Sequence, residues 1–273
     1  MFEVAELGHK LDRQAFNEKQ PAVREALLDA QFRLREANFS VAVVVAGAEG
    51  SGKGDLVNLL LEWLDARGVS THAMGEPTQE ETERARFYRF WRRLPATGTT
   101  AIFLGSWYTQ PIVDHALGNL TDEELDAALH KIADFERMLT HENTLLLKYW
   151  LHVTKKHQKR RFEKLAADQD TAWRVTERDW KFHKTYDEFI ETSGRAIRLT
   201  SKGHAPWQLV ESHDRRYRDM FVAEHLLNAI ETRLNQPPPS QSARIPPQSP
   251  QGPRNIINTL DLSQSLERKR YRE

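Results

Sequence analysis

Short apolar runs alternate with longer amphipathic stretches along most of the chain. We interpret five of these runs as strands, at residues 41–46, 69–74, 101–104, 145–151 and, more weakly, 196–199. Strands separated by helices are typical of crossover connections, which build a parallel sheet covered by helices on both faces. The pattern therefore predicts an α/β fold, in which ligands bind at the carboxyl ends of the strands.

The first helical stretch is expected at residues 5–38. A mostly apolar stripe runs along it, formed by Val23, Leu27, Leu28, Gln31 and Leu34. Pro21 lies just before this stripe. Proline is favoured at the first position of a helix, where its missing N–H leaves no hydrogen bond unmade. We therefore expect Pro21 at a first helical position.

A glycine-rich segment follows the first predicted strand directly. Residues 47–54, Gly-Ala-Glu-Gly-Ser-Gly-Lys-Gly, fit the phosphate-binding pattern G-x-x-x-x-G-K and precede a helical run at residues 55–65. Glycines let backbone N–H groups converge on phosphate oxygens, the helix N-terminus adds partial positive charge, and the lysine supplies an ammonium. The predicted phosphate-binding residues are Gly47, Gly50, Ser51, Gly52, Lys53 and Gly54, and Lys53 is also a catalytic candidate. A glycine-rich turn with a surface lysine is the alternative.

The position after the lysine departs from the usual pattern. A Ser or Thr there would place a hydroxyl on Mg²⁺, whereas this chain has Gly54. Glu49, inside the loop, is the nearest residue that could supply an oxygen instead. We therefore take Glu49 as the candidate Mg²⁺ ligand and as a second catalytic candidate.

Two basic clusters follow farther along the chain. One lies in residues 83–94, where Arg86, Arg89 and Arg93 are spaced to share one helix face while Phe87, Phe90, Trp91 and Leu94 line another. We expect these arginines to bind phosphate. Neutralisation by the nearby Glu80, Glu81 and Glu83 is the alternative.

The second cluster begins the segment that we expect to form a lid, about residues 154–195. Its basic residues are Lys155, Lys156, Lys159, Arg160, Arg161 and Lys164. Such a run is often only a solvated helix face. Behind a phosphate loop, a basic helical hairpin can close over the ligand. We favour the lid, with Lys155, Lys159, Arg160 and Arg161 contacting phosphate.

The composition changes after residue 234, where we expect the first domain (1–234) to end. Residues 235–256 hold seven of the 12 prolines, which is typical of an extended linker. Residues 257–273 regain an apolar pattern, and residues 266–273 repeat the form of residues 11–18. We interpret residues 257–273 as the start of a second repeat.

Charge and cysteine content narrow the class of protein. The 273 residues include 39 basic and 39 acidic ones and no cysteine. The balanced charge indicates no nucleic-acid partner, and the absence of cysteine excludes disulfides and suits a reducing compartment. No secretory signal and no run of membrane-spanning length is visible. We expect a soluble, cytoplasmic protein without a membrane partner.

Taken together, several segments between about Phe39 and Leu227 resemble the polyphosphate kinase 2 family. They are the phosphate loop, residues 75–81, Gly105-Ser-Trp-Tyr108, residues 147–152, residues 158–162, Trp173, Asp179, His204-Ala-Pro-Trp207 and Asp214-Arg-Arg-Tyr217. The linker and the repeated start are similar to the N-terminal half of the tandem polyphosphate:AMP phosphotransferases. The resemblance implies a P-loop kinase-like fold, a three-layer αβα arrangement with a central parallel sheet and a helical lid.

The same resemblance implies a function. Members transfer phosphoryl groups between polyphosphate and AMP or ADP with Mg²⁺ as cofactor, and they form homo-oligomers in the cytoplasm. A second homologous half downstream is expected as a partner.

The chain also departs from the family pattern. Active members carry Asp where this chain has Glu49, and Asp-Arg-Ser-Trp-Tyr-Asn-Arg where it has Leu104-Gly-Ser-Trp-Tyr-Thr-Gln110. One carboxylate and two arginines are therefore missing, and their loss weakens transition-state stabilisation. We expect a polyphosphate-dependent nucleotide phosphotransferase half with a degenerate site.

Three alternatives remain. The chain could be a working kinase with a metal site built on Glu49, or a non-catalytic module for polyphosphate or nucleotide binding and oligomerisation. A conventional ATP-dependent nucleoside monophosphate kinase is the third.

Overall fold

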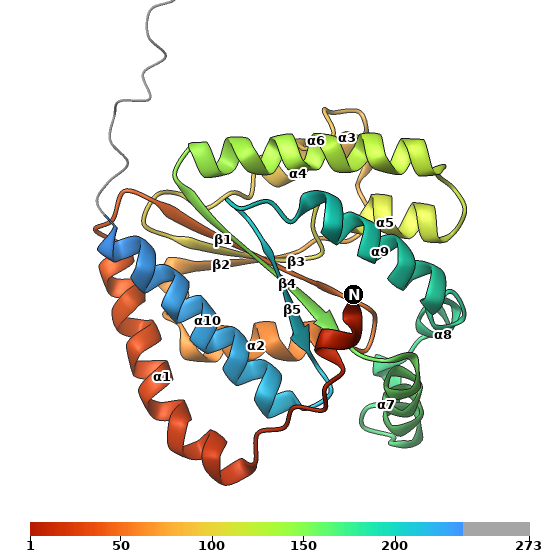
Figure 1. The fold of residues 1–273 in the computed structure, drawn as a ribbon, viewed down its shortest axis with the longest axis horizontal. Coiled ribbons are helices and arrows are strands. Elements are labelled where there is room, and N and C mark those ends of the chain that lie inside the picture. The colour runs from red at the N-terminus through yellow and green to blue at the C-terminus, as the bar shows by residue number, and fades with distance from the viewer. Residues whose placement is uncertain (237–273) are drawn as a thin grey trace, which may run out of the picture. The chain divides into compact units, whose positions relative to one another are not determined.

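A five-stranded sheet forms the centre of residues 1–236, the part of the chain that the computed structural model describes (Figure 1). Its strands are β1 (Ser40–Gly47), β2 (Val69–Ala73), β3 (Thr100–Leu104), β4 (Thr144–His152) and β5 (Trp207–Glu211), in the order β2-β3-β1-β4-β5. Every neighbouring pair is parallel. The expected α/β fold with a central parallel sheet is confirmed.

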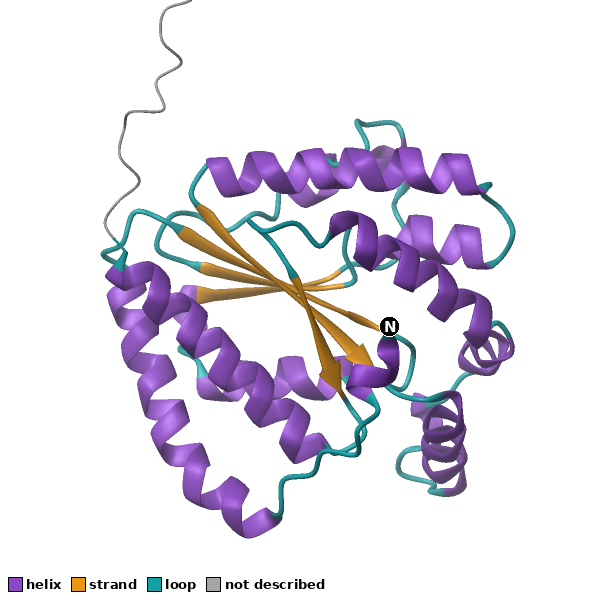
Figure 2. Cartoon of the chain, in the orientation of Figure 1, coloured by secondary structure: helices purple, strands orange, loops and turns teal. Residues whose placement is uncertain are grey.

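Helices cover both faces of this sheet (Figure 2). The longer helices are α1 (Arg13–Leu34), α2 (Lys53–Trp63), α5 (Thr109–Ala116), α6 (Asp122–His141), α7 (Lys155–Ala167), α8 (Glu177–Lys184), α9 (Tyr186–Thr200) and α10 (Arg215–Asn235). The short ones are η1 (Phe2–Ala5), η2 (Ala66–Gly68), α3 (Gln79–Thr82), α4 (Tyr88–Trp91) and η3 (Ala172–Arg174).

Alternate residues of β1 divide the core between the two faces. Val41, Val43 and Val45 pack with residues of α1, α2 and α10, whereas Ala42 and Val44 pack with residues of α5, α6 and α9. Side chains of successive strand residues point to opposite faces, so a strand buried on both sides has a continuous apolar sequence. The result is a three-layer αβα arrangement.

The first helix begins later than the sequence predicts. Residues before Asp12 form η1 and a segment without regular secondary structure, and the Asp12 side chain accepts a hydrogen bond from the backbone N–H of Ala15 at 2.9 Å. Pro21 therefore lies inside α1, and its expected place at a first helical position is wrong. An aspartate cap and the burial of Leu27 and Leu34 outweigh the cost of an internal proline.

The fifth strand also differs from the prediction. Residues 196–199 belong to α9, and the strand is Trp207–Glu211, which pairs with β4. Ala196 and Ile197 are buried on the same helix as Thr192 and Thr200, and this spacing is helical. A four-residue apolar run does not distinguish a buried helix turn from a strand.

The arginine-rich segment is not one continuous helix. Arg86 lies in a turn between α3 and α4, and Arg93 follows the end of α4, so these two and Arg89 do not share a helix face. The aromatic residues do hold the segment against the core, because Phe87 stacks on Phe135 at 4.5 Å between ring centroids. Here packing of separate aromatic rings decides the backbone path.

Residues 237–273 lie outside the described part of the chain, and with them most of the predicted linker and the predicted second repeat. Within residues 1–236, no helix has both the length and the apolar character needed to cross a membrane.

Candidate phosphate-binding site

The phosphate loop (residues 47–54) connects β1 to α2 at the carboxyl edge of the sheet. Gly47 and Gly52 both have positive φ angles, 140° and 88°. A Cβ at Gly47 would lie 2.3 Å from the carbonyl oxygen of Leu151 in β4. Both positions thus require glycine, one for close contact with the neighbouring strand and one for the backbone at the N-cap of α2.

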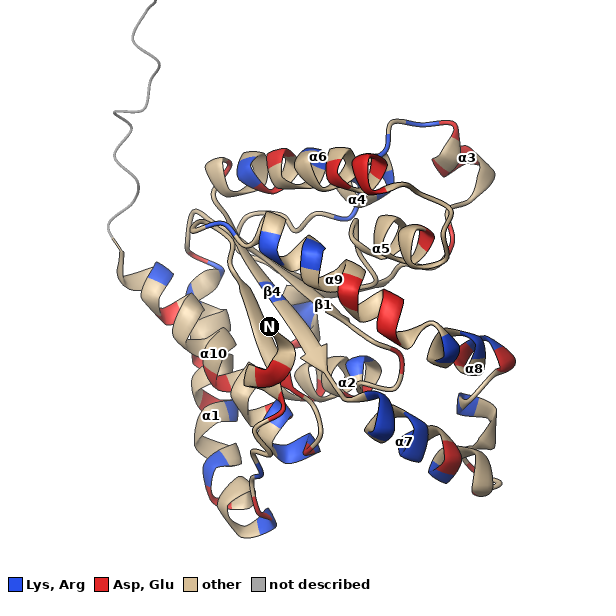
Figure 3. Ribbon diagram, turned by 45° about the vertical axis from the view of Figure 1, so that its right-hand side comes forward, with Lys and Arg blue, Asp and Glu red and all other residues tan. Residues whose placement is uncertain are grey.

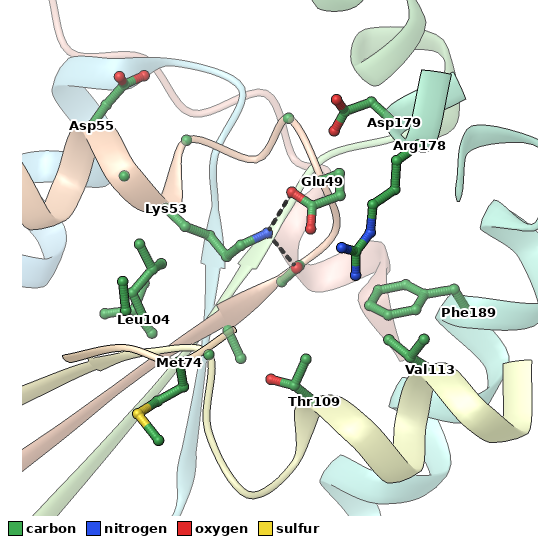
Figure 4. Close-up of a pocket in the computed structure, with 18 of the residues that line it drawn as sticks. Glu49, Lys53, Asp55, Met74, Leu104, Thr109, Val113, Arg178, Asp179 and Phe189 are labelled. Atoms are coloured by element: carbon green, nitrogen blue, oxygen red, sulfur yellow. Dashed lines mark hydrogen bonds and ion pairs between the residues drawn. The ribbon is translucent and has the colours of Figure 1, made fainter. Parts of the chain in front are cut away.

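Lys53, the first residue of α2, folds back over this loop (Figure 4). Its ammonium donates hydrogen bonds to the carbonyl oxygens of Gly47 and Ala48, both at 3.0 Å, and to the Glu49 carboxylate at 3.3 Å. The side chain is 17% exposed, so it remains accessible. A bound phosphate can take the place of these oxygens around the ammonium.

A pocket of about 660 Å³ opens beside the loop. One part of its wall is cationic and consists of Lys53, Arg161, Arg174 and Arg178. Another part is apolar and includes Met74, Leu104, Ile112, Val113 and Phe189 (Figure 4). A cavity with these two kinds of wall suits a ligand that combines phosphate groups with a flat apolar ring.

The segment predicted to form a lid (residues 154–195) supplies three of the four pocket cations. Arg161 comes from α7, which carries many basic residues (Figure 3), Arg174 from η3 and Arg178 from α8. Arg161 and Arg174 both bind the carboxylate of Asp55 in the first turn of α2, at 2.5 and 3.0 Å. Burial raises the pKa of Asp55. The hydrogen bonds and positive charges of the two arginines together lower it by more, so the pKa lies below its usual value.

The structure brings together only part of the predicted site. Gly47, Glu49, Gly50, Gly52, Lys53, Gly54 and Arg161 line the pocket. Ser51, also in the loop, is buried and does not line the pocket. Arg86, Arg89, Arg93, Lys155, Lys159 and Arg160 lie outside the lining.

Some of these outer cations already have anionic partners. Lys155 pairs with Asp187, Lys159 with Glu163 at 3.8 Å, and Arg89 with Glu81 at 3.4 Å. Their role as phosphate ligands stays a prediction.

Sequence reasoning missed Asp55, Arg174 and Arg178. From the sequence, Asp55 is only the first residue of a helical run, and the two arginines are scattered in a segment without a dense basic run. The signal available was the place of Arg174 and Arg178 within the predicted lid, but the direction of each side chain depends on how η3 and α8 pack in the folded chain.

The second motif, from Leu104 to Gln110, also reaches the pocket. Leu104, Gly105 and Thr109 line it, whereas Gln110 is exposed and does not. Gly105 has a φ of 79°, and a Cβ there would lie 2.7 Å from the carbonyl oxygen of Met74. A side chain at this position would need a different backbone.

Trp107 and Tyr108 of this motif are buried in the core. The Trp107 Nε1–H and the Tyr108 hydroxyl both donate to Glu136 Oε1, at 3.0 and 2.7 Å, and Lys148 donates to Glu136 Oε2 at 2.6 Å. Lys148 and Glu136 are 0% and 1% exposed. This buried network fixes the turn after β3 from behind.

The protein itself offers few ligands for Mg²⁺ at this site. In residues 1–236, no three His, Asp or Glu side chains gather as a metal site. Both oxygens of Asp55 are bound to arginines, so within the pocket lining an oxygen without a hydrogen bond remains on Glu49 and on Asp179. Mg²⁺ commonly binds through one or two carboxylates together with substrate phosphates and water, so the site fits a metal brought largely by the ligand.

Comparisons with known proteins agree on one family. The model of the polyphosphate kinase 2 (PPK2) family matches residues 10–238. The chain is 40% identical over its full length to the polyphosphate:AMP phosphotransferase of Pseudomonas aeruginosa and 38% identical over 99% of its length to that of Pseudomonas syringae. It covers 56% and 55% of those proteins, so it spans about half their length.

A solved structure shows the same fold. The crystal structure of a polyphosphate kinase 2 from Pseudomonas aeruginosa matches with a TM-score of 0.82 and 38% identity. The match covers 99% of this chain and 52% of that one.

Proposed function

Because the chain belongs to the polyphosphate kinase 2 family, we propose that its pocket binds the phosphate chain of polyphosphate together with AMP or ADP. The observation that carries this proposal is that Lys53 of the phosphate loop lines one cavity together with Arg161, Arg174 and Arg178 from the segment predicted to form a lid. Phosphoryl transfer depends mainly on positioning and on neutralising spread negative charge. Four cations around one cavity provide that neutralisation.

The apolar wall supports a nucleotide as the second ligand. Met74, Val113 and Phe189 offer a surface on which a base can pack. The Pseudomonas relatives are named for AMP, which favours this nucleotide. Bound with the phosphates and Glu49, Mg²⁺ would neutralise charge on the transferring group.

We infer that this half transfers phosphate weakly. Leu104 forms apolar wall where active members of the family have a carboxylate, and Gly105 offers no side chain at all. The same observation supports the alternative of a non-catalytic module that binds polyphosphate or nucleotide. The two proposals differ in whether any turnover remains.

We also infer a cytoplasmic protein that works as a homo-oligomer and with a second homologous half. The cysteine-free sequence supports the cytoplasmic location, and the half-length match to the Pseudomonas relatives supports the second half. The homo-oligomer rests on the family resemblance alone. The balanced charge supports the absence of a nucleic-acid partner.

The first test is binding of tripolyphosphate, measured by titration calorimetry. Lys53→Ala should weaken binding by about tenfold or more, because a charge-assisted contact to phosphate is lost. Lys131→Ala, on the exposed side of α6, removes the same charge outside the pocket and should leave affinity unchanged. Equal affinity of Lys53→Ala and the unaltered chain would overturn the proposal.

The second test is turnover with Mg²⁺, polyphosphate and AMP or ADP. The unaltered chain should fall well below the roughly 1–100 per second of typical kinases. Leu104→Asp should raise the rate, because it restores a carboxylate on the pocket wall. Gly105→Arg should not be added, since its positive φ strains any side chain. Robust turnover of the unaltered chain would show that Glu49 suffices.

A further inference from the structure

One carboxylate in the pocket holds two arginines that come from different parts of the lid. Asp55 Oδ2 accepts from Arg161 Nη2 at 2.5 Å, and Asp55 Oδ1 accepts from Arg174 Nη2 at 3.0 Å. Arg161 belongs to α7 and Arg174 to η3, whereas Asp55 is the third residue of α2, directly after the phosphate loop. The carboxylate therefore ties two lid elements to the helix that begins the site.

Both arginines keep hydrogen-bond donors for a ligand. A guanidinium has five N–H groups, and each of these uses one group for Asp55. Within residues 1–236 neither side chain makes another hydrogen bond. Both line the cavity, so the remaining donors are available on its cationic side.

The charges leave this cluster positive. Two guanidiniums and one carboxylate carry a net charge of +1, and the net lowering of the Asp55 pKa keeps its carboxylate ionised at neutral pH. Its side chain is 20% exposed, against 31% for Arg161 and 39% for Arg174. The most buried member is thus the anion, and the arginines extend from it toward solvent and ligand.

Holding the arginines in place has an energetic consequence. An arginine side chain has many rotamers, and part of this freedom is lost when the side chain binds phosphate. A fixed carboxylate that orients the side chain beforehand removes part of that loss from ligand binding.

We propose that Asp55 is a positioning residue that gathers Arg161 and Arg174 of the lid onto the phosphate loop before a phosphate chain binds. The inference rests on the proposed function, because it takes the pocket to be a phosphate site. Asp55 itself does not contact the ligand; it acts through the two arginines.

The test measures tripolyphosphate affinity by calorimetry at low salt. Asp55→Asn keeps the shape and removes the charge, and it should weaken binding about tenfold. Asp55→Glu keeps a carboxylate and should recover part of the loss, which a purely steric role would not predict. Asp134→Asn removes an equal charge from the exposed side of α6 and should bind like the unaltered chain.

A double-mutant cycle tests whether Asp55 acts through Arg174. Arg174→Met should weaken binding in the unaltered chain and have a clearly smaller effect in the Asp55→Asn background. Equal effects in both backgrounds would overturn the inference. Unchanged or tighter binding by Asp55→Asn would also overturn it, and tighter binding would make Asp55 a competitor of phosphate instead.

The outcomes separate the two proposals. If Lys53→Ala weakens binding and Asp55→Asn does not, the site is a phosphate site and the role of Asp55 is wrong. If the unaltered chain and both variants fail to bind tripolyphosphate, both proposals are wrong. Thermal unfolding of each variant shows whether the fold is kept. Arg174→Met removes the contact between Asp55 and Arg174 by changing the arginine, so it tests the proposal even if Asp55→Asn does not fold.

Discussion

At the scale of single residues, Gly52 has two roles: it faces the phosphate site, and it leaves room for the buried side chain of Arg218. The motif explains it as a glycine that lets backbone N–H groups face phosphate. In the structure its φ is 88°, and a Cβ would lie 1.8 Å from Nη1 of Arg218. Arg218 is fully buried, pairs with Asp219 at 2.6 Å, and reaches the carbonyl oxygen of Ser51 at 3.4 Å. The loop is therefore packed against α10 from below.

Gly52→Ala should lower the free energy of unfolding by about 1–3 kcal/mol, because it adds backbone strain and displaces a buried guanidinium. The measurement is urea unfolding followed by circular dichroism. Gly203→Ala is the matched control, since a Cβ there meets open space. Equal midpoints for the two variants would show that Arg218 moves aside without cost.

At the scale of elements, a buried ion pair joins α6 to β4. Lys148 Nζ lies 2.6 Å from Glu136 Oε2, behind the turn that holds Trp107 and Tyr108. Lys148 also donates to the carbonyl oxygen of Thr200 in α9 at 3.0 Å. Burial lowers the pKa of Lys148, and the Glu136 carboxylate opposes that change. A single ammonium thus connects β4 to two helices that cover one face of the sheet.

Lys148→Met should destabilise the protein by about 3–5 kcal/mol, because it leaves a buried carboxylate without its cation. The double variant Lys148→Met with Glu136→Leu should recover much of that loss, since neither charge then remains buried. Chemical unfolding of the two variants checks this. A double variant as unstable as the single one would indicate that packing, rather than charge, causes the loss.

At the scale of the whole molecule within residues 1–236, the basic residues of the predicted lid differ in whether they line the pocket. Arg160 and Arg161 are adjacent in sequence, but only Arg161 lines the cavity. Salt screens exposed charge contacts, with a Debye length of about 10 Å at 0.1 M. The affinity for polyphosphate should therefore fall as ionic strength rises.

Neutralising Arg160 and Arg161 in separate variants measures how much each contributes to polyphosphate binding. Arg161→Gln should weaken polyphosphate binding severalfold and flatten its salt dependence, whereas Arg160→Gln should change both only slightly. Affinity measured from low to high salt decides between them. Equal slopes for the two variants would mean that α7 attracts polyphosphate as a whole, without regard to the direction of its side chains.

The sequence by itself determined the strand, loop and helix of the phosphate loop and the alternation of strands and helices as far as β4, because local periodicity and glycine chemistry specify them. It predicted β1 to β4, the loop and Lys53 from patterns that each lie within a few neighbouring residues. The prediction of a fifth strand at residues 196–199 was wrong, because a short apolar run does not reveal what packs against it. The prediction that Arg86, Arg89 and Arg93 share one helix face was wrong for the same reason, since a spacing of three or four residues does not reveal its surroundings either.

Only the tertiary structure decided which charged residues meet. Asp55 and Arg174 are 119 positions apart, yet the fold brings them within 3.0 Å. Lys155 and Lys159, in the densest basic run, lie outside the pocket lining. The direction of a side chain on a helix depends on how that helix docks against the sheet, and docking is set by the burial of apolar faces contributed by distant parts of the chain.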